Sequence, residues 1–404
     1  MKKAFSTNIL VLFMLTFLYV QAHSDTLNSS PDAIPINPYK ELKKDFQNVL
    51  TVPFETSYDD IAKIIAGLPY SSYPIKIQNS DEWKTYSDYM NNSWSEFDSK
   101  RLRFVRDWAN TELTEANRKT GLLFYPFSGP DCLTAFQFFP NAKNFILIGL
   151  EPVGNLPLVE KWKPRYMKSY LENIKLSLSD FFTRGYFISR DMNQTLYGDK
   201  VNGVLPLICF FLKRSGNSII DIKRIAFDEK GNILEEPYRT LEKWPQRPYG
   251  IRITFSPESM SGSMKSMYYF SCDVSDASFI KNSKCYLYLD KLETMTVLIK
   301  SASYLLHYNN FSMMRNLILR KSRFILQDDT GIPYRFFRDD NWKVTLYGQY
   351  ADPIKEFSGV KQPDLMAAYK ANDIIRNLPF NLGYHWREKT DLLMLIQRKE
   401  SFSD

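Results

Sequence analysis

The stretch GLLFYPFSGPDCLTAFQFFPNAKNFILIGLE, residues 121–151, decides the fold. An apolar run ends at the turn SGPD (128–131), a short apolar segment follows, and Pro140 ends it. Residues 143–151 then predict a buried strand that ends on a carboxylate. Strand, tight turn, helix and strand in this order are typical of a parallel βαβ unit. We therefore expect an α/β protein with a Rossmann-like, mostly parallel sheet flanked by helices.

The beginning of the chain is typical of a signal peptide. Lys2 and Lys3 precede an apolar run over 9–20, and polar and small residues follow it. The run is shorter than the roughly 20 residues that span a bilayer, so we expect cleavage near residue 24. We expect an exported protein, periplasmic or secreted, with no membrane span after signal removal.

The remaining chain divides by its local patterns. Residues 25–40 predict a flexible leader, and 41–120 a helical N-terminal segment, with Ser80 as a helix cap. Residues 121–404 predict the α/β domain, with an antiparallel β insertion near 217–275.

Two later stretches carry further helix expectations. The stretch TVLIKSASYLLHY (296–308) predicts a helix, as does FSMMRNLILRKS (311–322). An apolar run then ends at the turn residues 328–331, and a further strand follows in 341–350.

Charge excludes one class of partner. The 52 basic and 45 acidic residues leave a formal net charge of +7. The charges are interspersed and form no long basic block, so we expect no nucleic-acid partner and no polybasic membrane patch. A small molecule or an envelope ligand fits this composition better.

Four cysteines lie in the portion expected to be exported, where disulfides are permitted. Cys272 and Cys285 close a short loop and are the first choice for a disulfide. Cys132 and Cys209 lie in apolar surroundings, which suits buried thiols equally well. No spacing of these cysteines is typical of a zinc site.

Polar residues follow three of the expected strands. If those strands are neighbours, the carboxylates gather at one rim and either hold a divalent cation or act as acid and base. Alternatively, each Asp caps a turn or a helix. The candidate catalytic residues are Ser128, Asp131, Asp328 and Asp329, and the candidate ligand-binding residues are Gly129, Glu151, Thr330 and Tyr334.

Other catalytic schemes have weaker support. Ser128 could be a nucleophile with His307 or His385 as its base, but both histidines also suit structural roles and the chain has no G-x-S-x-G motif. Lys300 lies in the expected helix 296–308. Either its amine is buried and has a function, or only its aliphatic chain is buried and its charge reaches water. The G-x-G-x-x-G fingerprint of dinucleotide sites is missing. The cofactor and the metal therefore stay unknown at this point.

Several strings in combination resemble an uncharacterised family of secreted bacterial proteins with a Rossmann-like α/β core. These are YPFSGPD, FPNAKNFILIGLEPVG, LQDDTGIPYRFF, LYGQYADPIKEF and LPFNLGYHW, within residues 83–386. The resemblance implies export and an α/β core, and it brings no activity with it.

Three functional hypotheses follow. The leading one is a hydrolase-like or metal-assisted small-molecule enzyme with a carboxylate-rich pocket. The second is a non-catalytic envelope protein that presents Tyr125, Phe127 and Tyr334 to a ligand. The third is a degenerate methyltransferase-like scaffold.

Overall fold

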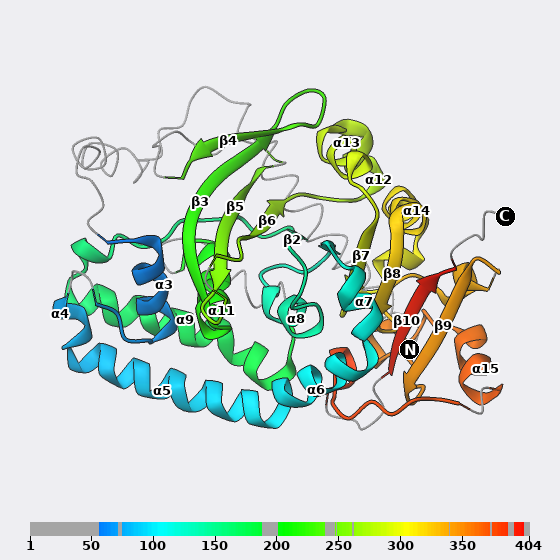
Figure 1. The fold of residues 1–404 in the computed structure, drawn as a ribbon, viewed down its shortest axis with the longest axis horizontal. Coiled ribbons are helices and arrows are strands. Elements are labelled where there is room, and N and C mark those ends of the chain that lie inside the picture. Colours follow the sequence, from blue (N-terminus) through cyan, green and yellow to red (C-terminus); the bar gives the residue numbers. More distant parts are fainter. Residues whose placement is uncertain are drawn as a thin grey trace, which may run out of the picture. The chain divides into compact units, whose positions relative to one another are not determined.

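A mixed sheet of ten strands forms the centre of the part of the chain that the computed structural model describes (Figure 1). The described residues are 56–71, 75–187, 201–238, 247, 249–260, 262–338, 340–371, 374–386 and 392–399. They all belong to one compact unit, Phe54–Asp404. The predicted signal peptide (1–24) and leader (25–40) lie outside the described residues.

From one edge to the other, the strands follow the order β4, β3, β5, β6, β2, β1, β7, β8, β10, β9. Their bounds are β1 (Leu122–Tyr125), β2 (Asn144–Gly149), β3 (Asn217–Phe227), β4 (Ile233–Pro237), β5 (Tyr249–Pro257), β6 (Lys265–Ser271), β7 (Met295–Ile299), β8 (Ser322–Gln327), β9 (Trp342–Gly348) and β10 (Leu392–Arg398). The order reverses at β1, which has β2 on one side and β7 on the other.

The expectation of a mostly parallel, Rossmann-like sheet is wrong. Only the four pairings among β6, β2, β1, β7 and β8 are parallel, and the five other pairings are antiparallel. The strands of the expected insertion near 217–275 extend this same sheet, because β5 pairs with β6 and β6 also pairs with β2. Antiparallel strands thereby satisfy the backbone groups that a parallel centre leaves unpaired at its edges.

The strand–turn–helix–strand unit expected over residues 121–151 is present. β1 is parallel to β2 with Leu123 opposite Phe145, and α8 (Cys132–Phe138) connects them. Asp131 caps α8, since its Oδ1 accepts the backbone N–H of Thr134 at 3.1 Å. All seven residues of α8 are buried. The turn before α8 lies at the edge of the sheet, because it follows the end of β1.

Helices cover both faces of the sheet (Figure 1). One core contains side chains of α3, α5, α6, α7, α8, α9 and α11, and the other contains side chains of α12, α13, α14 and α15. The remaining bounds are α3 (Tyr58–Ala66), α4 (Ile75–Gln78), α5 (Asp81–Phe97), α6 (Arg103–Glu112), α7 (Thr114–Lys119), α9 (Pro164–Arg184), α11 (Leu205–Arg214), α12 (Asp276–Lys281), α13 (Lys284–Lys291), α14 (Ser312–Lys321) and α15 (Pro363–Ala371).

The expected helix over 296–308 is wrong. Met295–Ile299 is instead the central strand β7, and all five of its residues are buried. A short apolar run cannot be distinguished from a buried helix by periodicity alone. The correction moves Lys300 from a helix face to the carboxyl end of a strand.

Candidate functional site

Four parallel neighbours, β2, β1, β7 and β8, end along one edge of the sheet. Such an edge is where ligands bind in open α/β sheets, above all where the strand order reverses. The loops that leave it carry most of the candidate site residues: Ser128, Gly129, Asp131, Glu151, Asp328, Asp329 and Thr330. The structure therefore brings these loops to the same edge.

Asp131 is neutralised by a lysine from the next strand. Lys300 Nζ lies 2.8 Å from Asp131 Oδ2, and both side chains are almost fully buried. Lys300 also donates to Thr134 Oγ1 at 3.1 Å and to the carbonyl of Gly185 at 2.6 Å. The Tyr125 hydroxyl donates to Asp131 as well. The Asp131 carboxylate and the Lys300 ammonium group thus both have partners within the protein. This favours a structural role for Asp131 as helix cap and counter-ion.

Asp328 holds the loop that follows β7. Its carboxylate accepts the backbone N–H of Ser301 at 2.8 Å and that of Thr330 at 2.9 Å. The Thr330 hydroxyl also donates to Asp328 and accepts the N–H of Ala302. Burial raises the pKa of Asp328, although these hydrogen bonds favour its ionised form. Asp328 therefore acts on the loop and has little capacity left for a ligand.

Asp329 differs from Asp328 in its side-chain partner, because it accepts a hydrogen bond from a tyrosine. The Tyr304 hydroxyl donates to Asp329 Oδ2. Burial, together with the negative charge of Asp328, raises the pKa of Asp329 to about 7. Burial and the Asp329 charge in turn raise the pKa of Tyr304. Asp329 is therefore a carboxyl group that exchanges a proton near neutral pH while Tyr304 stays protonated.

The backbone after Lys300 is strained. Ser301, Ser303 and Tyr304 have φ angles of 52°, 51° and 56°, and they are three of the five non-glycine residues with positive φ in the described ranges. Each such residue costs on the order of 1 to 2 kcal/mol. Tyr384 restrains this loop, since its hydroxyl donates to the carbonyl of Ser301 at 2.8 Å. Strain of this kind is typical of ligand-binding and catalytic loops.

Glu151 is directed toward the β1 turn. A Cβ at Gly129, where φ is 52°, would lie 3.4 Å from Glu151 Oε2, and one at Gly149 would lie 2.6 Å from the same atom. Glu151 is 5% exposed. Its side chain therefore occupies the space beside the turn. A dinucleotide site would need the backbone of this turn to be accessible to the ligand.

Among the described residues, Ser128 has no hydrogen bond to His307 or to His385, so the Ser–His scheme lacks its defining contact. Ser128 Oγ donates to the carbonyls of Gly129 (3.1 Å) and Ile148 (3.3 Å). His307 instead lies edge-on to Tyr304, with ring centroids 5.2 Å apart. Burial and the charge of Arg335 lower the pKa of His307 to about 4, so it is neutral at pH 7.

Tyr334 lies beside the Asp329 loop. It begins η6 (Tyr334–Phe337), and its backbone N–H donates to Gln362 Oε1 at 2.9 Å. Gln362 Nε2 in turn donates to the carbonyl of Asp329 at 2.9 Å. Tyr125, another aromatic expected to face a ligand, is 1% exposed and is bonded to Asp131.

Metal and disulfide chemistry find little support. Among the described residues, no three His, Cys, Asp or Glu side chains are grouped so that they could hold a metal ion. All four cysteines are free and buried. The expected Cys272–Cys285 disulfide is not formed in the structure. The two thiols are nevertheless in contact, and the hydrogen bond between them, with burial, raises the pKa of Cys272.

Sequence reasoning missed Tyr304, Ser301 and Tyr384 because it placed the first two in a helix and gave the third no role. The available signal was the order of residues in TVLIK: a threonine and three apolar residues followed by a lysine, which also suits a buried strand end.

Comparisons with known proteins add no family. A scan against protein-family models found no match, and neither the curated proteins nor the solved structures gave one. No described helix combines the length and the apolar character that crossing a membrane requires.

Proposed function

We propose that the protein is an exported, hydrolase-like enzyme that acts on a small molecule, with Asp329 as the group that accepts a proton. The observation that carries this proposal is the contact between Asp329 and Tyr304 on a strained loop. This loop lies where the order of the parallel strands reverses, which is the usual ligand position in such sheets.

The chemistry follows from the protonation states. A general base works best when its pKa lies near the working pH, and the pKa of Asp329 is about 7. Ionised Asp329 would take a proton from a water molecule as the oxygen of that water attacks the substrate. The bond to the leaving group would then break, and the proton on Asp329 would pass to the leaving group. Tyr304 would remain protonated and keep the Asp329 carboxylate oriented. Asp328 would hold Ser301 in its strained conformation directly, and Thr330, which donates to Asp328, would hold Ala302.

Hydrolysis of chromogenic substrates by the wild type and by Asp329→Asn tests the proposal. The panel contains carboxylic esters, phosphate esters and glycosides, and product release is measured from pH 5 to 9. We expect a wild-type rate that rises with pH through about 7, because the ionised base is required. We expect Asp329→Asn to be slower by about 10²-fold or more.

Asp340→Asn is the matched control, because Asp340 is exposed and lies in the turn before β9. Its rate should equal that of the wild type. Equal rates for the wild type and Asp329→Asn would overturn the role of Asp329. A wild-type protein inactive on all three classes would contradict the hydrolase assignment.

A second candidate function is non-catalytic binding of a small ligand. It is favoured by the internal hydrogen bonds that saturate Asp131 and Asp328, since such groups position loops without reacting. In this case a ligand that raises the melting temperature of the wild type would also raise that of Asp329→Asn, and no turnover would be detected.

A further inference from the structure

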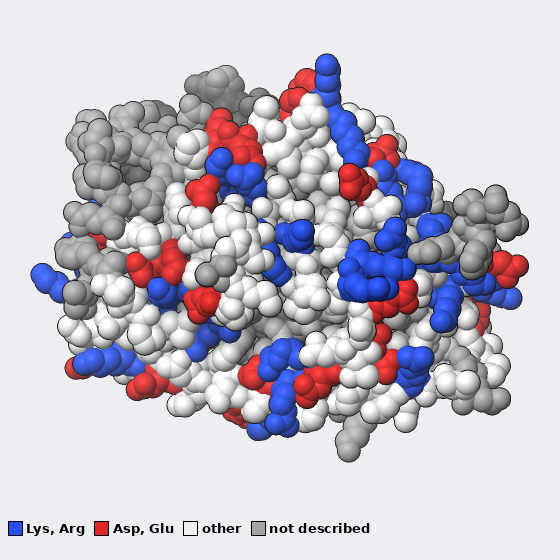
Figure 2. Space-filling model, in the orientation of Figure 1, with Lys and Arg blue, Asp and Glu red and all other residues white. Residues whose placement is uncertain are grey.

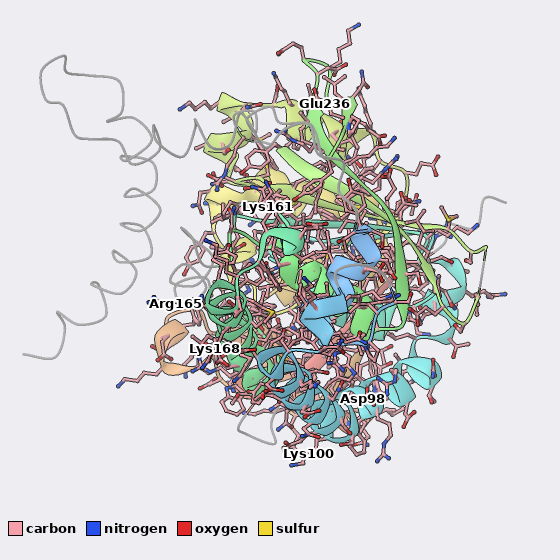
Figure 3. All side chains as sticks on the ribbon, turned by 90° about the vertical axis from the view of Figure 1, so that its left-hand side faces the viewer. Asp98, Lys100, Lys161, Arg165, Lys168 and Glu236 are labelled. Carbon is pink, nitrogen blue, oxygen red and sulfur yellow. The ribbon has the colours of Figure 1, made fainter. Side chains whose placement is uncertain are left out.

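A basic segment joins η3 (Val159–Lys161) to the first turn of α9. It has the sequence KWKPRYMK, residues 161–168. Four of its eight residues are cations with exposed side chains. They are Lys161, Lys163, Arg165 and Lys168. In Figure 3, the three labelled cations of this segment lie along the same side of the molecule.

Among the residues that the structure describes, no acidic side chain neutralises the basic segment. Among the described residues, none of its four cations forms an ion pair. Glu160, the acid that precedes it, accepts the backbone N–H of Thr56 at 3.1 Å. Glu172, the next acid along α9, pairs with Lys175 at 3.1 Å. By contrast, acidic and basic side chains are mixed over much of the face that Figure 2 shows.

Aromatic residues fix the basic segment to the body of the protein. The rings of Trp162 and Tyr170 are 5.3 Å apart, and Met167 and Tyr170 are buried. Tyr166 stays 49% exposed between the cations. The segment therefore presents a rigid set of charges with one half-exposed tyrosine ring. Sequence-independent binding of single-stranded nucleic acid needs several exposed rings on which bases stack, and this surface offers one.

We propose that the basic segment binds the headgroups of anionic phospholipids, so that the protein attaches to the surface of a membrane. Unpaired cations are complementary to a negatively charged lipid surface. Tyrosine is enriched at the level of the headgroups, where its ring is half in water. This surface is formed by η3 and α9 and does not include Asp329, so it is independent of the proposed reaction.

Vesicle sedimentation with the full chain tests this proposal. The vesicles contain phosphatidylcholine alone or a mixture with phosphatidylglycerol. The test variant carries Lys161→Gln, Arg165→Gln and Lys168→Gln.

The matched control carries Lys143→Gln, Arg323→Gln and Lys343→Gln, which removes the same charge from exposed positions at β2, β8 and β9. The apolar run 9–20 would bind both kinds of vesicle, so the readout is the ratio of the two partition coefficients.

Each basic residue near an anionic surface contributes about a fivefold factor to partitioning. We therefore expect the test variant to lose on the order of 100-fold of the preference for phosphatidylglycerol, and the control to lose little. Added salt should weaken the preference of the wild type. Circular dichroism checks that both variants are folded.

Three results would overturn the proposal. The first is a wild type that binds both vesicles equally. The second is the same loss in the test and control variants, which would indicate net charge alone. The third is an oligonucleotide that the wild type binds and the test variant does not, while vesicle binding is unchanged.

Discussion

Lys300 and Asp131 form a buried ion pair whose two members depend on each other. Removing one partner of such a pair costs about 3 to 5 kcal/mol, because the other charge is left without compensation. We expect Lys300→Met to lower the free energy of unfolding by about this amount. Lys300→Met with Asp131→Asn should recover a large part of it, because no buried charge remains.

Urea unfolding at pH 7 measures both variants. Equal midpoints for the single and the double variant would show that the carboxylate of Asp131 is not the source of the cost. A single variant as stable as the wild type would show that the pair does not contribute to stability.

Asp329 makes stability depend on pH. Its pKa is raised to about 7 in the folded protein, above its value of about 4 in an unfolded chain. The folded state therefore binds more protons between these values, so the contribution is fully present below pH 4 and is lost as pH rises through 7. We expect the wild type to lose more stability between pH 5 and 8 than Asp329→Asn does.

Thermal unfolding of both proteins at a series of pH values checks this expectation, with Asp340→Asn as the control that should follow the wild type. Parallel curves for the wild type and Asp329→Asn would contradict it.

At the scale of elements, the loop after β2 packs on the segment before α11 with almost no space between their backbones. A Cβ at Gly154, where φ is 72°, would lie 1.5 Å from the carbonyl oxygen of Asn202. We expect Gly154→Ala to destabilise the protein by more than about 1 kcal/mol, since the backbone must move as well as change conformation. Gly121→Ala is the control, because a Cβ there would meet nothing within 4 Å.

Chemical denaturation followed by tryptophan fluorescence compares the two glycine variants. Similar midpoints for Gly154→Ala and Gly121→Ala would show that the two segments do not pack as the structure has them.

Sequence patterns predicted some elements well and failed for others. The β1–α8–β2 unit could be recognised because Asp131 and Pro140 mark its turns, and α5 because Ser80 caps it, accepting the N–H of Trp83 at 3.3 Å. β7 was missed because its apolar run, residues 297–299, is short and is followed by Lys300 instead of a turn residue. The Asp329–Tyr304 contact depends on that strand, so it could not be predicted either.

At the scale of the whole molecule, sequence could not predict that the hairpins share one sheet with the parallel centre. Local pattern reports whether a strand exists, but its partner is set by long-range packing. The rim of carboxylates was expected from the same reasoning, and the loops do converge. The carboxylate side chains, however, bind to separate partners. Which partner each carboxylate binds depends on the register of β7 and on the loop that follows it.

Strand β4, at one of the two edges of the sheet, has a consequence for how molecules of this protein meet each other. Its residues Glu235 and Glu236 are followed by Pro237, which has no N–H to donate, and the last four residues of the strand are exposed. Glu235 is paired with Lys223 and Arg252, so a second copy adding a strand here would mainly meet the charge of Glu236 and one missing hydrogen bond at Pro237. Growth of sheets from one molecule into the next should therefore be disfavoured at this edge.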